Sequence, residues 1–150
     1  MGIYTTFFGH ASTAVENDYP DDYDEKWNQL PSERFCIHCP WKLDGEDLIP
    51  EGEIGTVDPW VIWLCEIIVD FVEPASVIIR GAIPYTTGDG YNYSGIIIIK
   101  PKPDNQYEVG YLEVDEESGD TTTSMLDLNE LKGKTSKERE SIYRQKFPRF

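Results

Sequence analysis

The most apolar stretch of the chain covers residues 60–73 and reads WVIWLCEIIVDFVE. Just before it, Asp58 suits a helix N-cap and Pro59 suits the first helical position, while Pro74 closes the stretch. This pattern predicts a helix over 58–73. At 1.5 Å per residue the helix would be about 22 Å long, which is shorter than the roughly 30 Å hydrocarbon core of a membrane.

Only three residues of this stretch are polar, and they follow helical spacing. Glu66, Asp70 and Glu73 stand at positions i, i+4 and i+7, so they share one narrow side of the helix. A helix this apolar must be covered over most of its circumference. We therefore expect a core helix with a solvated acidic stripe. The alternatives are that part of the helix forms a dimer or partner interface, or that Glu66 and Asp70 form a carboxylate pair in a cleft.

Beyond Pro74 the pattern changes to that of β-strands. Segments 75–85, 91–100 and 107–114 are rich in Val, Ile and Tyr, and the sequences TTGDG and PKPDNQ between them are typical of turns. This spacing predicts an antiparallel three-stranded meander. The four isoleucines at 96–99 break the alternation of a half-buried strand, which predicts a central strand covered on both faces.

The N-terminal half has weaker patterns. Residues 3–14 predict a first strand, residues 34–39 a short strand ended by Pro40, and residues 43–55 a loop. Residues 16–33 predict an acidic loop. A short helix within it is permitted by apolar residues at helical spacing, namely Tyr23, Trp27 and Leu30.

The C-terminal part begins with a Thr-rich segment after Asp120, which we expect to be a loop. Further on, Thr135 and Glu138 match a capping box, which opens a short basic helix ending near Lys146. The elements together predict an α+β fold. Its sheet is mostly antiparallel, formed by the N-terminal strand and the C-terminal three-strand meander, and it packs on one major apolar helix beside the short basic C-terminal helix.

Charge is distributed unevenly along the 150 residues, which carry a net charge of −15. Residues 1–130 hold 26 acidic and six basic residues, and residues 131–150 hold two acidic and seven basic ones. We expect an acidic domain over 1–130 and a basic helix or tail over 131–150 within the same domain. The acidic part would repel nucleic acid and anionic membranes, and the basic segment could dock on it or reach an anionic partner.

The cysteines and the N-terminus indicate a reducing compartment. Three cysteines are too few, and odd in number, for a disulfide framework. The opening sequence MGIYTTFFGHAST lacks the basic and continuous apolar regions of a signal peptide. We expect a cytoplasmic protein without a cofactor.

Two sets of residues invite a chemical interpretation. Cys36, His38 and Cys39 could bind a metal, but they form one ligand pair where a structural zinc site normally has two, and a strand would turn Cys39 away from the others. Cys65 is expected to pack as a small apolar side chain inside the helix. His10, His38 and Cys36 could serve a small enzyme, although no sequence signature pairs them.

Two features point to binding of another macromolecule. Acidic residues crowd together before the apolar helix and again after the third strand of the meander, and the DGYNYSG sequence at 89–95 forms a hairpin tip that presents tyrosines on one face. The predicted partner-binding residues are Asp18, Asp21, Asp22, Asp24, Glu25, Asp89, Tyr91, Tyr93, Glu113, Asp115, Glu116 and Glu117.

Several short segments of the sequence resemble known proteins, and this resemblance indicates the biological origin of the chain. The opening Met1-Gly2-Ile3-Tyr4-Thr5, the later "IIRGAIPY", the Gly-Asp-Gly turn and "GIIIIKP" resemble small phage and bacterial proteins to which no activity is assigned. The resemblance covers about a dozen positions and implies a phage or bacterial origin, which places the expected cytoplasmic protein in a bacterial host cell.

These observations favour a non-enzymatic acidic protein that occludes a basic surface of a partner protein. Carboxylates would stand in for phosphates, as in an inhibitor of a bacterial defence nuclease or an immunity protein. A structural or accessory protein that oligomerises through the apolar helix, including as a homodimer, is the alternative. A small enzyme is the second alternative. We expect no direct contact with nucleic acid or membrane.

Overall fold

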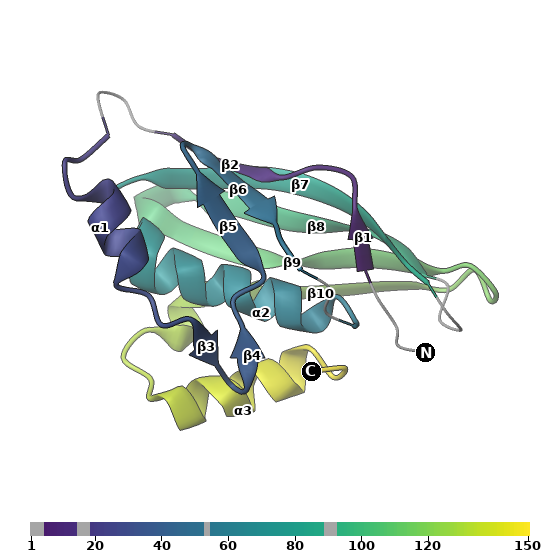
Figure 1. Ribbon diagram of the computed structural model, residues 1–150. Coiled ribbons are helices and arrows are strands. Elements are labelled where there is room, and N and C mark those ends of the chain that lie inside the picture. The colour runs from purple at the N-terminus through teal and green to yellow at the C-terminus, as the bar shows by residue number, and fades with distance from the viewer. Residues whose placement is uncertain (1–4, 15–18, 53–54, 89–92) are drawn as a thin grey trace.

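The computed structural model describes residues 5–14, 19–52, 55–88 and 93–150 (Figure 1). It contains an antiparallel eight-stranded sheet in the order β10-β9-β8-β7-β2-β6-β5, with β1 also paired to β7. The strands are β1 (Thr5–Phe7), β2 (Ala11–Ala14), β5 (Trp41–Asp44), β6 (Asp47–Pro50), β7 (Ile78–Thr87), β8 (Tyr93–Lys102), β9 (Gln106–Asp115) and β10 (Thr121–Asp127). A separate hairpin comprises β3 (Glu33–Arg34) and β4 (Ile37–His38), and the α-helices are α1 (Tyr23–Asn28), α2 (Asp58–Ile67) and α3 (Ser136–Lys146).

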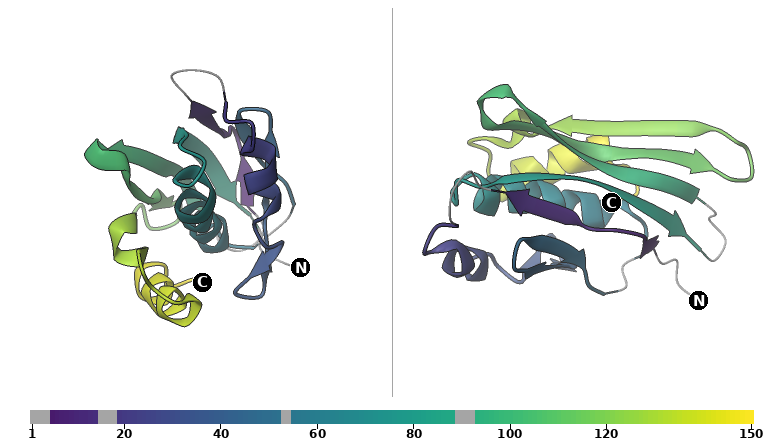
Figure 2. Two further views of the ribbon diagram at one scale, coloured as in Figure 1. Left: turned by 90° about the vertical axis from the view of Figure 1, so that its left-hand side faces the viewer. Right: turned by 90° about the horizontal axis from the view of Figure 1, so that it is seen from above.

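The sheet curves around α2. Figure 2 shows this helix nearly end-on, with the strands around it and α3 beside it. Nine of the ten residues of α2 are buried, and the chain continues as a π-helical turn over Ile68–Val72, so the predicted extent of 58–73 is confirmed. The predicted N-cap is wrong: Val57 occupies that position, and Asp58 lies in the first turn without capping it.

The predicted meander is confirmed, and one detail of it is wrong. Strands β7, β8 and β9 pair in sequence order, and Ile97 stands between Ile83 and Tyr111 on the face that packs against α2. The run of isoleucines does occupy the middle strand. However, Ile96 and Ile98 are only half-buried, because the described residues place no helix on the opposite face of the sheet.

Two segments predicted as loops are strands. The Thr-rich segment forms β10, which pairs with β9 over seven residues. Threonine is a good strand former, but an edge strand made largely of Thr and Ser lacks the apolar alternation that identifies a strand in sequence. Residues 43–55 include most of the β5–β6 hairpin, which turns at Gly45 with a φ of 62° and buries Leu48.

Two other predicted strands are divided. The described part of the predicted strand 3–14 forms β1 and β2, which both pair with β7 and are separated by residues 8–10. Residues 34–39 contribute to the β3–β4 hairpin. Phe35 and Cys36 in this hairpin have left-handed backbone conformations, with φ angles of 55° and 62°. The short helix predicted from Tyr23, Trp27 and Leu30 is confirmed as α1.

The basic C-terminal helix is confirmed together with its capping box. The Thr135 hydroxyl accepts from the backbone N–H of Glu138, and the Glu138 carboxylate accepts from the backbone N–H of Thr135. Tyr143 and Phe147 are fully buried, so this segment contributes to the core. Among the described residues, no helix has the length and apolar character needed to cross a membrane.

A substitution at Gly110 tests the close contact between β9 and β10. A Cβ atom at this position would lie 1.8 Å from the Ser124 carbonyl oxygen, which is a backbone atom of the neighbouring strand. Gly110→Ala should therefore lower the free energy of unfolding by about 3 kcal/mol through overpacking. Gly9→Ala is the control, because its Cβ would make an ordinary 3.8 Å contact with Pro84. If the two variants unfold at the same midpoint concentration of urea, this result would contradict the predicted clash.

Candidate functional site

The predicted partner-binding residues lie at two opposite ends of the molecule. Asp21, Asp22, Asp24 and Glu25 are exposed on or beside α1, whereas Asp115–Glu117 lie at the turn between β9 and β10 (Figure 1). Asp18, Asp89 and Tyr91 fall outside the described residues. The structure therefore does not bring the predicted set together as one continuous surface.

The first group of carboxylates is joined by a second group from the β5–β6 hairpin. The Tyr23 hydroxyl of α1 donates to the Gly45 carbonyl at 3.3 Å, which places α1 against the β5–β6 turn. Thr13 links the two segments, because its hydroxyl lies 2.9 Å from the Tyr23 hydroxyl and 3.0 Å from the Glu46 carbonyl oxygen. Burial raises the pKa of Tyr23, and the charges of Asp24 and Glu46 raise it further. We call this surface the acidic end: Asp21, Asp22, Asp24, Glu25, Asp44, Glu46 and Asp47.

Glu113 does not belong to the acidic surface, contrary to the prediction. It is only 3% exposed and lies on the face of β9 that points into the core. The hydroxyl of Tyr85 donates to one of its oxygens at 2.6 Å, and Arg149 contacts both of them. Tyr93 is half-buried, with the Arg149 guanidinium 5.1 Å from its ring centroid.

The contacts of Glu113 belong to a buried network at the start of α2. The backbone N–H of Arg149 donates to Asp58 at 2.8 Å, and its guanidinium donates to Asp58 at 3.2 Å and to Tyr111 at 3.0 Å. We call Asp58, Glu113, Arg149, Tyr85 and Tyr111 the terminal network. It ties the second-last residue of the chain to the first turn of the core helix.

A second network occupies the other end of α2. Arg34 donates to Glu66 at 2.8 Å and also to Asp70, while Arg139 donates to the same carboxylates at 3.1 and 3.3 Å. The Tyr143 hydroxyl donates to Glu66 as well. We call these five residues the central network. Glu66 is 1% exposed, so the predicted solvated stripe is wrong for this residue.

Burial and charge act in opposite directions on the ionisable groups of the networks. Burial disfavours charge on Arg149, but hydrogen bonding to Glu113 and the charge of Asp58 raise its pKa above the ordinary value. Burial raises the pKa of Asp58, and the neighbouring Arg149 lowers it in part. The arginines thus remain charged. Glu66 and Asp70, each bound by two arginines, are poorly placed to exchange protons with a substrate.

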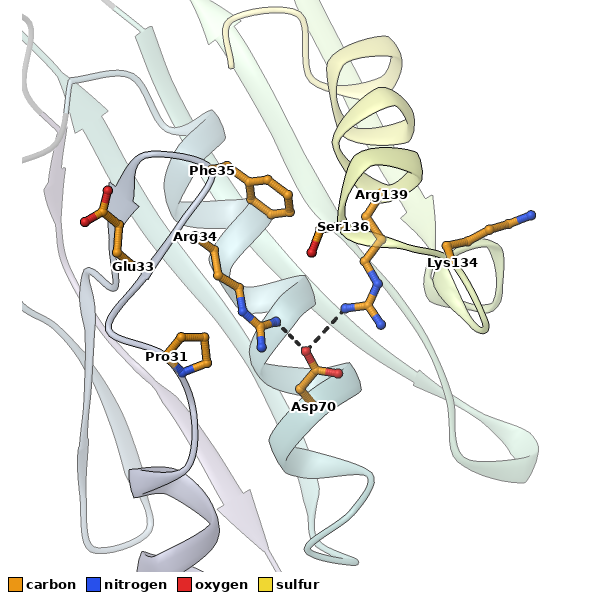
Figure 3. Close-up of a pocket in the computed structure, with 8 residues that line it drawn as sticks. All are labelled: Pro31, Glu33, Arg34, Phe35, Asp70, Lys134, Ser136 and Arg139. Carbon is orange, nitrogen blue, oxygen red and sulfur yellow. Dashed lines mark hydrogen bonds and ion pairs between the residues drawn. The ribbon is translucent and has the colours of Figure 1, made fainter.

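An open pocket of about 480 Å³ adjoins the central network (Figure 3). Arg34 reaches it from β3, Asp70 from the π-helical turn after α2, and Ser136 and Arg139 from the first turns of α3. Figure 3 shows both arginines pointing at Asp70. The pocket is completed by Pro31, Glu33, Phe35 and Lys134.

The guanidinium of Arg139 is only partly satisfied by the described residues. The contacts of Arg34 and Arg139 with the carboxylates of the central network all use one terminal nitrogen, Nη1. The Nε of Arg139 is buried and has no hydrogen-bond partner in the part of the chain that is described. This arrangement can accept an additional oxyanion through the remaining N–H groups.

The residues considered for metal binding do not converge. Cys36 is exposed, the side chain of His38 is 83% exposed, and burial raises the pKa of the Cys39 thiol. Over the described ranges, no group of three or more Cys, His, Asp or Glu residues is placed to hold a metal ion. Cys65 is fully buried within α2.

The residues considered for catalysis are likewise separated. His10 is paired with Asp47 at 3.4 Å, whereas His38 is 3.8 Å from Glu33 on the β3–β4 hairpin. Cys36 and His38 both line a second, more apolar pocket near Pro40, but no hydrogen bond between their side chains is present. The structure does not assemble these residues into a catalytic group.

The two networks were not predicted, although the sequence held one signal for them. The expectation that the basic C-terminal segment could dock on the acidic domain is met by Arg139 and Arg149. What the sequence did not indicate was that their partners are carboxylates of the core helix. Three acids inside an otherwise apolar helix, with no lysine or arginine among them, are the pattern that requires cations from elsewhere.

Arg149 allows a direct test of the terminal network. Arg149→Met would leave Asp58 and Glu113 buried together without a cation, which should lower the free energy of unfolding by about 3–5 kcal/mol. Arg144→Met is the control, because Arg144 pairs with Glu140 at the surface and should contribute less than about 1 kcal/mol. Chemical denaturation of both variants measures the difference, and equal stabilities would show that the network does not form.

The chain was compared with protein-family models, curated proteins and solved structures, and no match was found.

Proposed function

We propose that this protein is a non-enzymatic binding protein whose acidic end docks on a basic surface of a partner protein. The supporting observation is the convergence of carboxylates from α1 and the β5–β6 turn, two segments that are about 20 residues apart in the chain. A surface of this kind suits a cationic site that ordinarily binds nucleic acid, because its carboxylates can replace phosphates. An inhibitor of a nuclease and an immunity protein are the functions we consider.

The internal ion pairs leave this negative charge available. The two networks contain four acidic residues and three arginines, so they account for only one of the 15 net negative charges. Within the acidic end, Lys26 pairs with Asp22 and His10 with Asp47. The other five carboxylates have no ion pair among the described residues, so most of this charge can steer a basic partner toward this end.

The structure gives less support to the other functions considered. Oligomerisation through the apolar helix would require a free face on α2, but nine of its ten residues are buried by the chain itself. An enzyme built on His10, His38 and Cys36 would require these groups to meet, but His10 pairs with Asp47, and Cys36 and His38 share a pocket without a hydrogen bond between their side chains. Binding through a charged surface needs neither condition.

Two matched variants test the proposal. The triple variant Asp21→Asn/Asp24→Asn/Glu25→Gln removes three charges from the acidic end, and Asp104→Asn/Asp120→Asn/Glu130→Gln removes three exposed charges elsewhere. Proteins retained from a bacterial lysate by each tagged chain are quantified by mass spectrometry. We expect a basic partner to be lost about tenfold with the first variant and retained with the second. If both triple variants lose the partner equally, net charge alone explains the loss, and this result would contradict a specific binding site.

A second candidate function is the binding of a small organic anion in the pocket beside α3. The buried, unpartnered Nε of Arg139 favours it, together with Lys134 and the N-terminal end of α3. Among the residues that line the pocket, Arg34, Lys134 and Arg139 carry three positive charges, and Glu33 and Asp70 carry two negative ones, so the lining has an excess of one positive charge. Phe35 and Pro31 supply an apolar wall.

Titration with acetate and with inorganic phosphate tests the pocket. The Nε–H signal of Arg139 should shift in nuclear magnetic resonance spectra, and Lys134→Gln should weaken binding about tenfold. Lys137→Gln is the control, because Lys137 is exposed but does not line the pocket. Equal affinities of the two variants would contradict a site at Lys134.

A further inference from the structure

The pocket beside α3 combines a cationic lining with an apolar wall. Arg34 and Arg139 point at Asp70 within it (Figure 3). Pro31 and Phe35 supply the apolar part of the same lining. A ligand that fills this pocket therefore contacts both kinds of side chain, and the balance between them indicates which class of anion the pocket takes.

The apolar wall is already in place, because its ring is held by neighbouring rings. Phe35 lies in the two-residue turn of the β3–β4 hairpin with a φ of 55°, a conformation that is unfavourable for a bulky side chain. Its ring contacts Tyr143 and Phe150 edge-on, with centroid distances of 5.6 and 6.0 Å. These contacts fix the ring before a ligand arrives, so packing an apolar group against it costs little side-chain entropy.

The cationic part of the lining keeps hydrogen-bond donors for a ligand. Nη1 of Arg34 and of Arg139 binds the carboxylates of the central network, whereas Nη2 of each makes no hydrogen bond to a described residue. The two side chains are only 21% and 14% exposed, so water screens their charges less than at an open surface. The net charge of the lining, an excess of one positive charge, therefore restricts the charge of the ligand.

We propose, on the basis of the second candidate function, that the anion bound in this pocket is a monocarboxylate attached to an apolar group. A carboxylate carries one negative charge, which equals the excess of the lining, and its two oxygens match the paired N–H groups of a guanidinium. A phosphate monoester carries nearly two negative charges at neutral pH, so its second charge would remain unbalanced beside Asp70 and Glu33. The apolar group of the ligand would pack against Phe35 and Pro31.

Titration with three ligands of related structure tests the class of anion. Benzoate, acetate and phenylphosphate are added at about pH 8, where the phosphate monoester is a dianion, and dissociation constants are measured from chemical shifts in nuclear magnetic resonance spectra. We expect benzoate to bind about tenfold more tightly than acetate, which has no ring to pack against Phe35. We expect a similar factor of about ten over phenylphosphate, because the lining does not balance its second charge.

The same titration distinguishes two sources of such a carboxylate, a free carboxylic acid and the C-terminus of a peptide. N-acetylphenylalanine has the carboxylate, amide and side chain of a peptide C-terminus, whereas benzoate represents a free acid. Tighter binding of the first would assign the pocket to a peptide C-terminus, and tighter binding of the second would assign it to a free acid. Both results support the shared chemistry. Equal binding of the neutral amide of N-acetylphenylalanine would overturn it, because the carboxylate would then contribute nothing.

Glu33→Gln tests the charge balance directly. Glu33 lines the pocket, and its half-exposed side chain is 3.8 Å from His38, so we expect the variant to fold. The substitution should strengthen the binding of phenylphosphate about twice as much, on a logarithmic scale, as that of benzoate, because a dianion interacts twice as strongly with the removed charge. Glu130→Gln is the control and should change neither affinity, because Glu130 is exposed and does not line the pocket.

Three further results would overturn the proposal, and only the first would also remove the second candidate function. If no ligand shifts the Nε–H signals of Arg34 and Arg139, the pocket does not bind anions at all. If phenylphosphate binds as tightly as benzoate, or if Glu33→Gln changes both affinities equally, the pocket binds anions but does not select a monocarboxylate. If acetate binds as tightly as benzoate, the apolar wall takes no part in recognition.

Discussion

The structure depends on ion pairs that neutralise the acids of its central helix. The sheet encloses α2 so completely that Asp58 and Glu66 are buried, and a buried carboxylate without a cation is strongly unfavourable. The chain meets this constraint with Arg34, Arg139 and Arg149, which come from a hairpin before the helix and from the last 20 residues. The C-terminal segment is for this reason an integral part of the core.

These ion pairs also specify how α2 sits inside the sheet. An all-apolar helix can rotate about its axis and bury nearly the same area in each position, because the hydrophobic effect is not directional. Charges remove this freedom, since a rotation would separate Glu66 from Arg34 and Arg139 at once. Asp58 imposes the same requirement at the other end of α2, where it binds Arg149. Two networks about two turns apart thus fix both the rotation and the axial position of the helix.

Local patterns in the sequence were sufficient to predict some helices and strands but not others. The prolines around 58–73, the alternation in 75–114 and the capping box at Thr135 each act within a few residues, and the corresponding elements were predicted. Strand β10 was missed because polar residues dominate this edge strand, which needs only one apolar face, and the β5–β6 hairpin was missed because each of its strands is only four residues long. The acids of α2 look alike in sequence whether water or arginine surrounds them. The difference lies in residues more than 30 positions away, and no local pattern carries it.

The same constraint determines which charges remain for function. Because the networks take up three of the 13 basic residues, the rest of the chain is left with 24 acidic and ten basic residues. The carboxylates predicted as one surface separate into the acidic end and the β9–β10 turn, at opposite ends of the sheet. The acidic end therefore has to act without the carboxylates of the turn. Lys26 and His10 pair with only two of its seven carboxylates, which is why the function proposed above assigns its remaining charge to a basic partner.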